Sequence, residues 1–397
     1  MTAPINFNRP AMPAAAYRYL RQAVGNMHLS GDGPFTKRCH ALLETILGAP
    51  KTLLTTSCTH ALEMAALLLD VRPGDEVVVP SFTFVSTANA FVLRGARVVF
   101  ADVRPDTLNL DERQLPALLT RRTRAVVPVH YAGVGCEMDA ICAAGVPVVE
   151  DNAHGLFGTY NGRPLGSFGA MAAQSFHETK NISCGEGGAL VLNDPAFVER
   201  AEVIREKGTN RSRFFRGEVD KYTWVDVGSS YLPSDALAAL LLAQLEARAD
   251  IQARRRAVWD RYRAGLADWA AEGRVRLPHV PDHCGHPAHL FYLLLPTLDD
   301  RQALLAHLKA RGIVATFHYV PLHLSEMGAK HGGRPGLCPV TEAVSDRLVR
   351  LPLYFDLTDA DVDRVLDAVT AYRVPAGREP VADVLARAAE PRRAAAA

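Results

Sequence analysis

The sequence predicts an α/β fold with a mostly parallel sheet, and two observations support this prediction. Short apolar runs rich in β-branched residues recur at 51–56, 76–80, 96–103, 124–130 and 146–151, each separated from the next by enough chain for a crossover helix. These runs are apolar throughout rather than alternating, which is typical of strands buried on both faces. Helical spacing of apolar residues follows the first run, over 59–71. Such alternation favours a parallel sheet covered by helices.

The second half of the chain predicts a smaller, separate unit. A long helical pattern covers 234–269 without a glycine before Gly265, and we expect it to connect two domains. Strands are predicted at 288–295 and 313–320, with helices near 300–311 and two more helical segments ending near Arg373. We therefore expect a large α/β domain over 1–250, a small α+β domain over 251–374 and a disordered, alanine- and arginine-rich tail over 375–397.

Composition excludes several classes of partner. The 397 residues are 48% hydrophobic and 22% charged, which suits a globular protein with a large core. Since 44 basic residues balance 43 acidic ones, no overall field attracts nucleic acid or an acidic membrane surface. The seven cysteines are scattered and form no C-x-x-C motif, which favours reduced thiols. Neither a signal peptide nor an apolar run of about 18 residues is found, so we expect a cytoplasmic protein.

A phosphate site is predicted where the first strand meets its helix. Ser57, Cys58 and Thr59 lie at that junction, where free backbone N–H groups, hydroxyls and the helix dipole favour an anion. In open parallel sheets ligands collect at the carboxyl ends of the strands, which is where this junction lies. The alternative is an ordinary helix cap provided by Ser57 or Thr59.

Asp151 ends a predicted central strand in "VVEDNAHG". A carboxylate there is costly unless a cation or a hydrogen-bond donor meets it, and a protonated pyridine nitrogen is one such cation. Pyridoxal phosphate needs that proton to withdraw electrons, which predicts this cofactor. The alternative is a carboxylate that caps the following turn. His154 follows three residues later and either contacts the ring's oxygen substituent or satisfies a local hydrogen bond.

The stretch "SFHETKN" places Lys180 in a loop between two segments that are predicted to be buried. Burial lowers a lysine pKa enough to supply an unprotonated amine near neutral pH, which is what attack on an aldehyde requires. The loop continues into "ISCGEGGALVLND", whose glycines allow close backbone approach or simply form a tight turn before a strand.

Two further groups allow more than one interpretation. Phe82 and Phe84 lie at a strand-to-helix turn, where an aromatic ring either stacks on a flat cofactor or packs into the core. Four side chains able to bind metal occur in "HCGHPAH" at 283–289, but no second pair of ligands matches them. We expect structural histidines there and no metal site.

Taken together, these motifs resemble the DegT/DnrJ/EryC1/StrS sugar aminotransferases. The resemblance covers Ile5 to Arg373 and depends most on "SCTHALEMAALLLD", "GDEVVVPSFTFVSTANAFVLRGA", "PVHYAGV", "VVEDNAHG", "SFHETKN", "GEGGALVLND" and "FHYVPLH". It implies the type I, aspartate-aminotransferase-like fold of pyridoxal-phosphate enzymes. Further runs, including "REKGTNRSRFFRGEVDKYTWVDVGSSYLPSD", are similar to the branch that makes dTDP-4-amino-4,6-dideoxygalactose.

The resemblance assigns roles to individual residues. Lys180 matches the lysine that binds the cofactor aldehyde covalently, and Asp151 matches the partner of the pyridine nitrogen. Ser175 matches a hydroxyl that holds the cofactor phosphate together with Thr59 and its neighbouring amides. His154 lies where the family has glutamine or histidine near the phenolic oxygen.

Three other positions follow from the same resemblance. Phe84 matches an aromatic residue that stacks on the cofactor ring, and His323 matches a residue on the substrate side. Many members carry an asparagine that reaches the phosphate across a dimer interface, whereas this chain has Gly228-Ser229-Ser230, so Ser230 is the candidate substitute. Because family sites are completed by a second subunit, a homodimer is expected.

The activity implied is transfer of the amino group of L-glutamate to C4 of a nucleotide-linked 4-keto-6-deoxy sugar. The expected substrate is dTDP-4-keto-6-deoxy-D-glucose, giving dTDP-4-amino-4,6-dideoxy-D-galactose for polysaccharide biosynthesis. The alternatives are another nucleotide keto-sugar, or a non-catalytic nucleotide-sugar-binding protein on the same fold. A sister branch with histidine in place of the lysine dehydrates at C3, and Lys180 argues against it.

Overall fold

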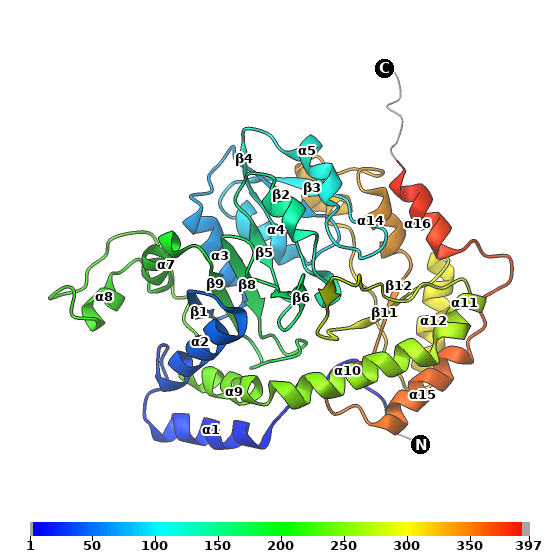
Figure 1. Ribbon diagram of the computed structural model, residues 1–397, viewed down its shortest axis with the longest axis horizontal. Helices are drawn as coiled ribbons and strands as arrows, with labels where there is room; N and C mark the ends of the chain where they lie inside the picture. The colour runs from blue at the N-terminus through cyan, green and yellow to red at the C-terminus, as the bar shows by residue number, and fades with distance from the viewer. Residues whose placement is uncertain (1–2, 391–397) are drawn as a thin grey trace.

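A computed structural model describes residues 3–390 and contains a large, mostly parallel sheet (Figure 1). One part has the order β1-β9-β8-β5 and the other the order β3-β2-β4. Isolated parallel bridges at Val126–Val148 and Val129–Asp151 join the two parts. The strands are β1 (Lys51–Thr55), β2 (Glu76–Pro80), β3 (Arg97–Ala101), β4 (Thr123–Val126), β5 (Val149–Asp151), β8 (Met171–Ser175) and β9 (Gly188–Leu192). Of these only β9 runs antiparallel to its neighbours, so the predicted α/β class and mostly parallel sheet are confirmed.

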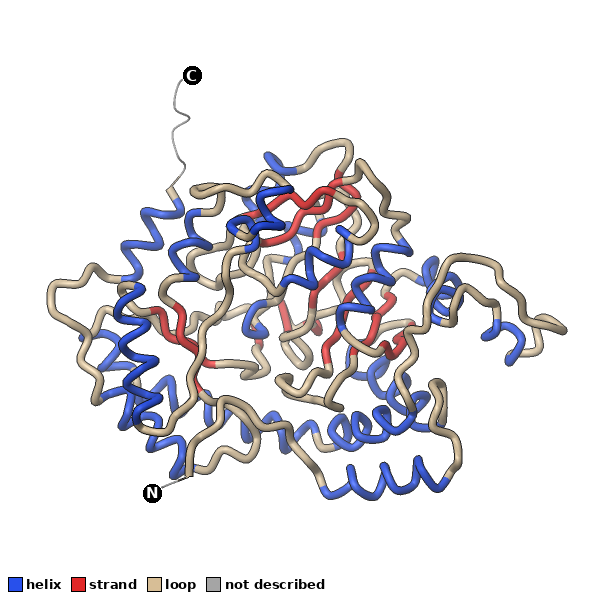
Figure 2. The backbone as a smooth tube through the Cα atoms, turned by 180° about the vertical axis from the view of Figure 1, so that it is seen from behind, coloured by secondary structure: helices blue, strands red, loops and turns tan. Residues whose placement is uncertain are grey.

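The sheet is buried on both faces, as its continuous apolar strands predict. Leu53 and Leu190 face one core cluster, whereas their neighbours Leu54 and Val191 face another. Helices α3 (Cys58–Leu68), α4 (Val85–Val92) and α7 (Val198–Arg205) contribute to the first cluster, and α2 (Pro34–Leu47) and α9 (Asp235–Glu246) to the second. α1 (Ala14–Gly25) packs outside α9. Figure 2 shows the strands enclosed by this helical layer.

A second core surrounds a two-stranded antiparallel sheet of β11 (Phe291–Leu294) and β12 (Leu348–Leu351). Helices α10 (Arg248–Gly265), α12 (Leu298–Ala310) and α15 (Asp359–Thr370) pack around it. The helical pattern predicted over 234–269 is divided at Ala247 and Leu266 into α9, α10 and α11 (Ala267–Glu272), and it runs from one core to the other. The predicted domain boundary at residue 250 stays a prediction.

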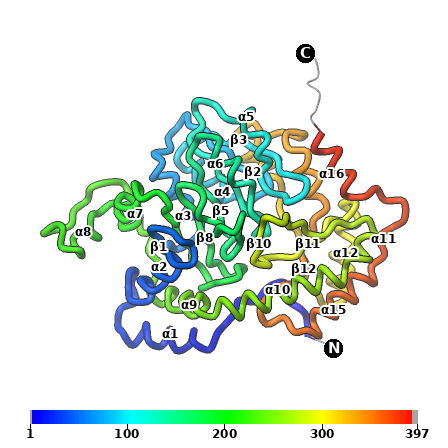
Figure 3. Tube along the Cα trace, viewed as in Figure 1, coloured from blue at the N-terminus to red at the C-terminus, as the bar shows by residue number. Residues whose placement is uncertain are grey.

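The N-terminal segment also belongs to the second core. Ile5 is 2% exposed, and its N–H donates to the carbonyl of Gly312 at 2.8 Å. A parallel bridge pairs it with Ile313. Figure 3 shows this segment running beside α10 and α15 before it reaches α1.

The prediction of a strand over 313–320 is wrong. The segment forms only single bridges, Ile5–Ile313 and Thr316–Arg350, because β11 takes β12 as its ladder partner. Its polar positions turn instead toward a cavity, which Thr316 and His318 help to line. In residues 313–320 the placement of polar side chains at the cavity therefore outweighs the strand propensity of the segment.

The tail predicted to be disordered from residue 375 is folded as far as residue 390. It forms α16 (Val381–Ala389), which packs on α14 (Pro339–Ser345). Val381 and Leu385, one helical turn apart, are both 1% exposed. Alanine and arginine both have high helix propensity. The alanine- and arginine-rich composition that indicated disorder therefore supports a helix here, because Val381 and Leu385 pack on α14. Residues 391–397 of that prediction lie outside the described residues.

Replacing Leu385 with alanine should lower the free energy of unfolding by about 2–5 kcal/mol, because it leaves a cavity under α16. Urea denaturation followed by circular dichroism measures the change. Ala386→Ser on the exposed face of the same helix should change it by less than about 0.5 kcal/mol. Equal effects of the two substitutions would contradict the packing described.

The remaining elements are short. The helices are α5 (Leu115–Leu118), α6 (Met138–Cys142), α8 (Arg211–Phe215) and α13 (Glu326–Lys330), and the strands are β6 (Thr159–Tyr160), β7 (Arg163–Pro164) and β10 (Cys284–Gly285). Single 3₁₀ turns are η1 (Glu112–Gln114), η2 (Tyr131–Gly133), η3 (Pro195–Phe197) and η4 (Leu322–Leu324). α8 projects from the body on an arm (Figure 1). Over residues 3–390, no helix combines the length and apolarity that a bilayer crossing requires.

Candidate active site

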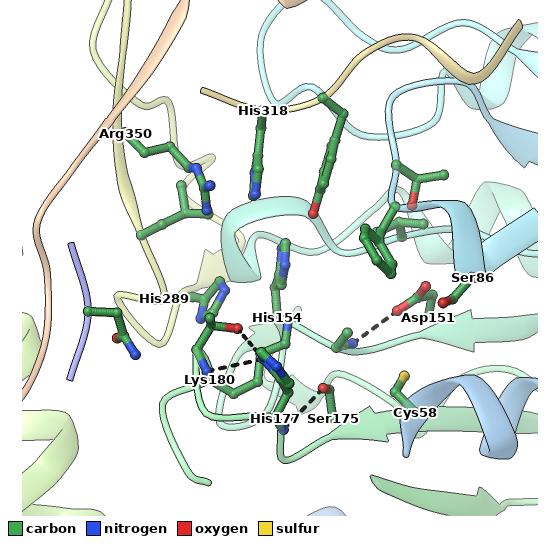
Figure 4. A pocket seen from close by; sticks show the side chains of 18 of the residues that line it. Cys58, Ser86, Asp151, His154, Ser175, His177, Lys180, His289, His318 and Arg350 are labelled. Atoms are coloured by element: carbon green, nitrogen blue, oxygen red, sulfur yellow. Dashed lines mark hydrogen bonds between the residues drawn. The ribbon is translucent and has the colours of Figure 1, made fainter. Parts of the chain in front are cut away.

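A cavity of about 590 Å³ opens where the carboxyl ends of the parallel strands face the second core. Eight of the ten site residues predicted from the sequence line it, and Figure 4 labels Cys58, Asp151, His154, Ser175 and Lys180 among them. The eight are Ser57, Cys58, Thr59, Phe84, Asp151, His154, Ser175 and Lys180. They meet because parallel strands end at one edge of the sheet, and β9 begins at that edge.

The N-terminus of α3 forms one wall. Ser57 has extended backbone angles and its Oγ accepts from the His60 N–H at 3.1 Å, so the predicted helix cap is present. The Thr59 hydroxyl contacts the Ser86 hydroxyl at 2.8 Å. A Cβ added to Gly188 would lie 2.4 Å from the backbone of Ser57 and Cys58, so only glycine lets β9 pass this turn. Capping and cavity lining therefore occur at the same junction.

Asp151 lies at the end of β5 and is 5% exposed. Its Oδ2 accepts from the Thr87 hydroxyl at 2.7 Å, and its Oδ1 accepts from the Ala153 N–H at 3.1 Å. The bond from the Ala153 N–H is the turn cap that the sequence predicts as the alternative role of Asp151. Burial raises the pKa of Asp151, against the opposing effect of these hydrogen bonds. No arginine, lysine or histidine of residues 3–390 forms a salt bridge with it, so its hydrogen-bond donors are neutral, and the charges of Lys180 and His130 lower its pKa only from a longer distance.

Lys180 lies in the turn after β8, where its N–H donates to the carbonyl of His177 at 2.9 Å. Burial lowers the pKa of Lys180, and Arg350 lowers it further, while the Asp151 carboxylate acts in the opposite direction. The thiol of Cys58 is neutral because burial raises its pKa well above the usual range. The lysine predicted to be reactive is therefore partly desolvated and faces the cavity (Figure 4).

Aromatic residues at this edge take different places. Phe84 is the N-cap of α4 and is 57% exposed, so it is a cavity residue and not a core residue. Phe82 is fully buried against Tyr131 and Tyr319. Whether Phe84 stacks on a cofactor stays a prediction.

The structure adds site residues that sequence reasoning missed. His289 and His318 line the cavity with His154, and Arg350 projects into it from β12 (Figure 4). The sequence predicts only a structural role for His289. An arginine within the apolar run "LVRLPL" was a signal that could have indicated Arg350, because a charge in a buried strand needs a reason.

The other members of the 283–289 cluster point to separate partners. His283 contacts Glu137 at 3.3 Å, and His286 bonds to Arg256. Across residues 3–390, no three His, Cys, Asp or Glu side chains are grouped as metal ligands would be.

Two predicted site residues lie outside the cavity. His323 is 1% exposed, with Nδ1 bonded to the Ser81 hydroxyl at 2.5 Å and Nε2 to Glu342 at 2.9 Å. These partners hold it in η4, and His318 lines the cavity in its place. Ser230 lies on an exposed segment that bridges to Glu206.

The residues present fit pyridoxal phosphate. A buried carboxylate without a cationic partner suits the protonated ring nitrogen, and the helix N-terminus with Thr59 and Ser175 suits the phosphate. Lys180 supplies an amine whose pKa burial lowers. The buried Nδ1 of His154 has no hydrogen-bond partner among the described residues. The fold places Lys180, Asp151 and the N-terminus of α3 around one cavity that fits this cofactor.

Comparison with known proteins gives the family. The profile of the DegT/DnrJ/EryC1/StrS aminotransferase family matches residues 11–370. The aminotransferase TlmJ from Streptoalloteichus hindustanus is 32% identical, with a TM-score of 0.84 over 92% of this chain and 98% of that one. The sugar aminotransferase Spr1654 from Streptococcus pneumoniae, in its PMP form, is 25% identical, with a TM-score of 0.86 over 96% and 100%. CalS13, a sugar aminotransferase from Micromonospora echinospora, is 26% identical, with a TM-score of 0.83 over 92% and 99%.

The chain belongs to the DegT/DnrJ/EryC1/StrS aminotransferase family. It is an aminotransferase with the type I fold, which confirms the family, the fold and the enzymatic class expected from the sequence.

Proposed function

We propose that this protein uses pyridoxal phosphate to transfer the amino group of L-glutamate to C4 of a nucleotide-linked 4-keto-6-deoxy sugar. The substrate proposed is dTDP-4-keto-6-deoxy-D-glucose, and the product is dTDP-4-amino-4,6-dideoxy-D-galactose. The observation that carries the proposal is that a desolvated lysine and a strand-end carboxylate line one cavity with a helix N-terminus. The choice of this sugar depends on motif resemblance. We place the reaction in the cytoplasm, where the seven free cysteines stay reduced.

The chain's own residues divide the work. When bound, the cofactor supplies an aldehyde and an electron-withdrawing ring. With the cofactor bound, Asp151 would hold the proton on its ring nitrogen, and Thr59 and Ser175 would hold its phosphate with the amides of α3. Lys180, with its lowered pKa, would take a proton from the α-carbon of the amino donor and, in the second half-reaction, give one to C4 of the sugar.

Arg350 is the residue we assign to an anionic group of the amino donor. Its guanidinium lies 4.6 Å from the Phe7 ring centre, and Nη2 donates to the carbonyl of Phe317 at 3.1 Å. Its buried Nε has no partner, and within residues 3–390 no carboxylate forms a salt bridge with it. A guanidinium is planar, and its free N–H donors match the two oxygens of a carboxylate. An α-amino acid such as L-glutamate carries a carboxylate on its reacting carbon.

Replacing Arg350 with glutamine should raise KM for L-glutamate by about 10- to 100-fold, because hydrogen bonds to a charged group are lost. KM for the keto-sugar should change little. Steady-state kinetics with each substrate varied in turn gives both values, with Arg311→Gln on the exposed surface as control. A rise confined to the sugar's KM would move Arg350 to the diphosphate of the sugar.

The proposal includes a homodimer with shared sites. Ser230 lies outside the cavity of its own chain, on an exposed segment. Nearby Trp224 is 78% exposed and Val225 is 52% exposed, which is a high exposure for large apolar side chains. A second copy of the chain would cover this segment and bring Ser230 to its neighbour's phosphate site.

The deciding experiment is incubation of the purified protein with pyridoxal phosphate, L-glutamate and dTDP-4-keto-6-deoxyglucose, followed by NMR of the product. Formation of the 4-amino-4,6-dideoxygalactose nucleotide supports the full proposal. An amine at another carbon or of another configuration would correct the sugar assignment. Absence of any amino transfer to nucleotide keto-sugars would overturn it.

A further inference from the structure

His154 is held in the cavity wall by other rings. Its Nδ1 is buried without a partner, and no hydrogen bond to its imidazole occurs within residues 3–390. The His289 ring stacks on it with centres 4.2 Å apart and planes 27° apart. The His318 ring is parallel to it at 6.1 Å, and Tyr131 meets it edge-on at 5.8 Å. Its orientation therefore depends on stacking, and His289 is its nearest ring.

His289 is in turn fixed by Asn181, the residue that follows Lys180. The Asn181 side-chain NH₂ donates to the Pro287 carbonyl at 2.8 Å and to Gln252 Oε1 at 3.1 Å. Both amide hydrogens are thus used, so Oδ1 can only accept. It lies 2.8 Å from Nδ1 of His289, which must carry the proton. The His289 ring therefore has one tautomer and one orientation.

The groups around His154 oppose its protonation. Burial lowers the pKa of His154 well below its ordinary value, and the nearby charges of Lys180 and Arg350 lower it further. The pKa values of His289 and His318 are lowered in the same way, chiefly by burial. A proton on one of these rings would repel a proton on the next. The stacked rings and the two cations favour a neutral His154.

We propose that Asn181 and His289 form a positioning pair that holds the His154 ring in one orientation and keeps it neutral. This rests on the proposed function and on the contact of His154 with the cofactor's phenolic oxygen that the family resemblance implies. A neutral imidazole of fixed orientation gives that oxygen a hydrogen bond of constant direction. Because Asn181 is adjacent to Lys180, the pair also ties the lysine turn to the segment that leads into β11.

Histidine-labelled protein tests this by ¹⁵N NMR without cofactor or substrate. In the unaltered protein His154 should remain neutral as the pH falls, and His289 should show protonated Nδ1 only. His289→Ala removes the ring and admits water, so the pKa of His154 should rise by about one unit or more. His289→Phe keeps a stacked ring and should restore most of the low value. His283→Ala, on the same segment but outside the cavity, is the control.

The loaded enzyme gives a second readout. In His289→Ala the acid limb of the kcat/KM profile should move to higher pH by the same amount as the His154 titration. An unchanged His154 titration in a folded His289→Ala protein would overturn the proposal, whether or not amino transfer to the sugar is found. Should that variant not fold, Asn181→Ala leaves the ring in place and should populate both tautomers of His289. A single tautomer there would overturn the proposal equally.

Discussion

Replacing Lys180 with alanine should abolish turnover, with a loss of at least about 10⁴-fold in kcat. In the proposed function the substitution removes both the amine that binds the cofactor aldehyde and the group that moves the proton. Cofactor binding should persist, because the residues proposed to hold the phosphate and the ring nitrogen lie on α3, β8 and β5. Steady-state kinetics measures the loss, and borohydride reduction followed by peptide mapping should label residue 180 of the unaltered protein only.

A matched variant separates chemistry from charge. Lys180→Arg keeps the cation but has no amine that can be unprotonated near neutral pH, so it should be as inactive as the alanine variant. Lys330→Ala, on the exposed surface, should behave like the unaltered protein. Substantial turnover by Lys180→Ala, or borohydride labelling at another residue, would contradict the assignment.

Replacing Asp151 with asparagine should lower kcat by about 10²- to 10³-fold, because a neutral amide cannot hold the ring-nitrogen proton. The substitution also makes a stability prediction with a definite sign. Burial raises the pKa of Asp151, so its ionised form destabilises the apoprotein as the pH rises above the ordinary aspartate pKa. At neutral pH the Asp151→Asn apoprotein should therefore be at least as stable as the unaltered one, and the holoprotein less stable.

Thermal unfolding of the unaltered protein and of the Asp151→Asn variant, each with and without pyridoxal phosphate, measures this reversal. Asp282→Asn, on an exposed loop, serves as control and should change the stability of neither the apoprotein nor the holoprotein. If the Asp151→Asn holoprotein were as stable and as active as the unaltered one, the carboxylate would have no role toward the ring nitrogen.

The sheet and half of the site were predictable for the same reason. Continuous apolar runs identify strands buried on both faces, and the polar residues that end them collect at one edge. This brought Ser57, Asp151 and Lys180 together from sequence alone. The loop character of Lys180 followed from the glycines after it.

The other half of the site could not be predicted because it comes from the second core. His289 and Arg350 lie more than 100 residues from Lys180, and only the packing of β11 and β12 against the sheet brings them near it. The run "FHYVPLH" contains two histidines, and no periodicity decides that His318 faces the cavity while His323 bonds to Ser81. Side-chain direction in an irregular segment depends on its neighbours in space.

The attachment of Ile5 to Ile313 affects how the chain matures and how it should be handled. Phe7 and Asn8, which follow Ile5, line the cavity, and Asn8 donates to the carbonyl of Glu178. During translation these first residues must wait for more than 300 others before their docking surface exists. The part of the cavity wall that Phe7 and Asn8 form is therefore completed only after residue 313 has been synthesised.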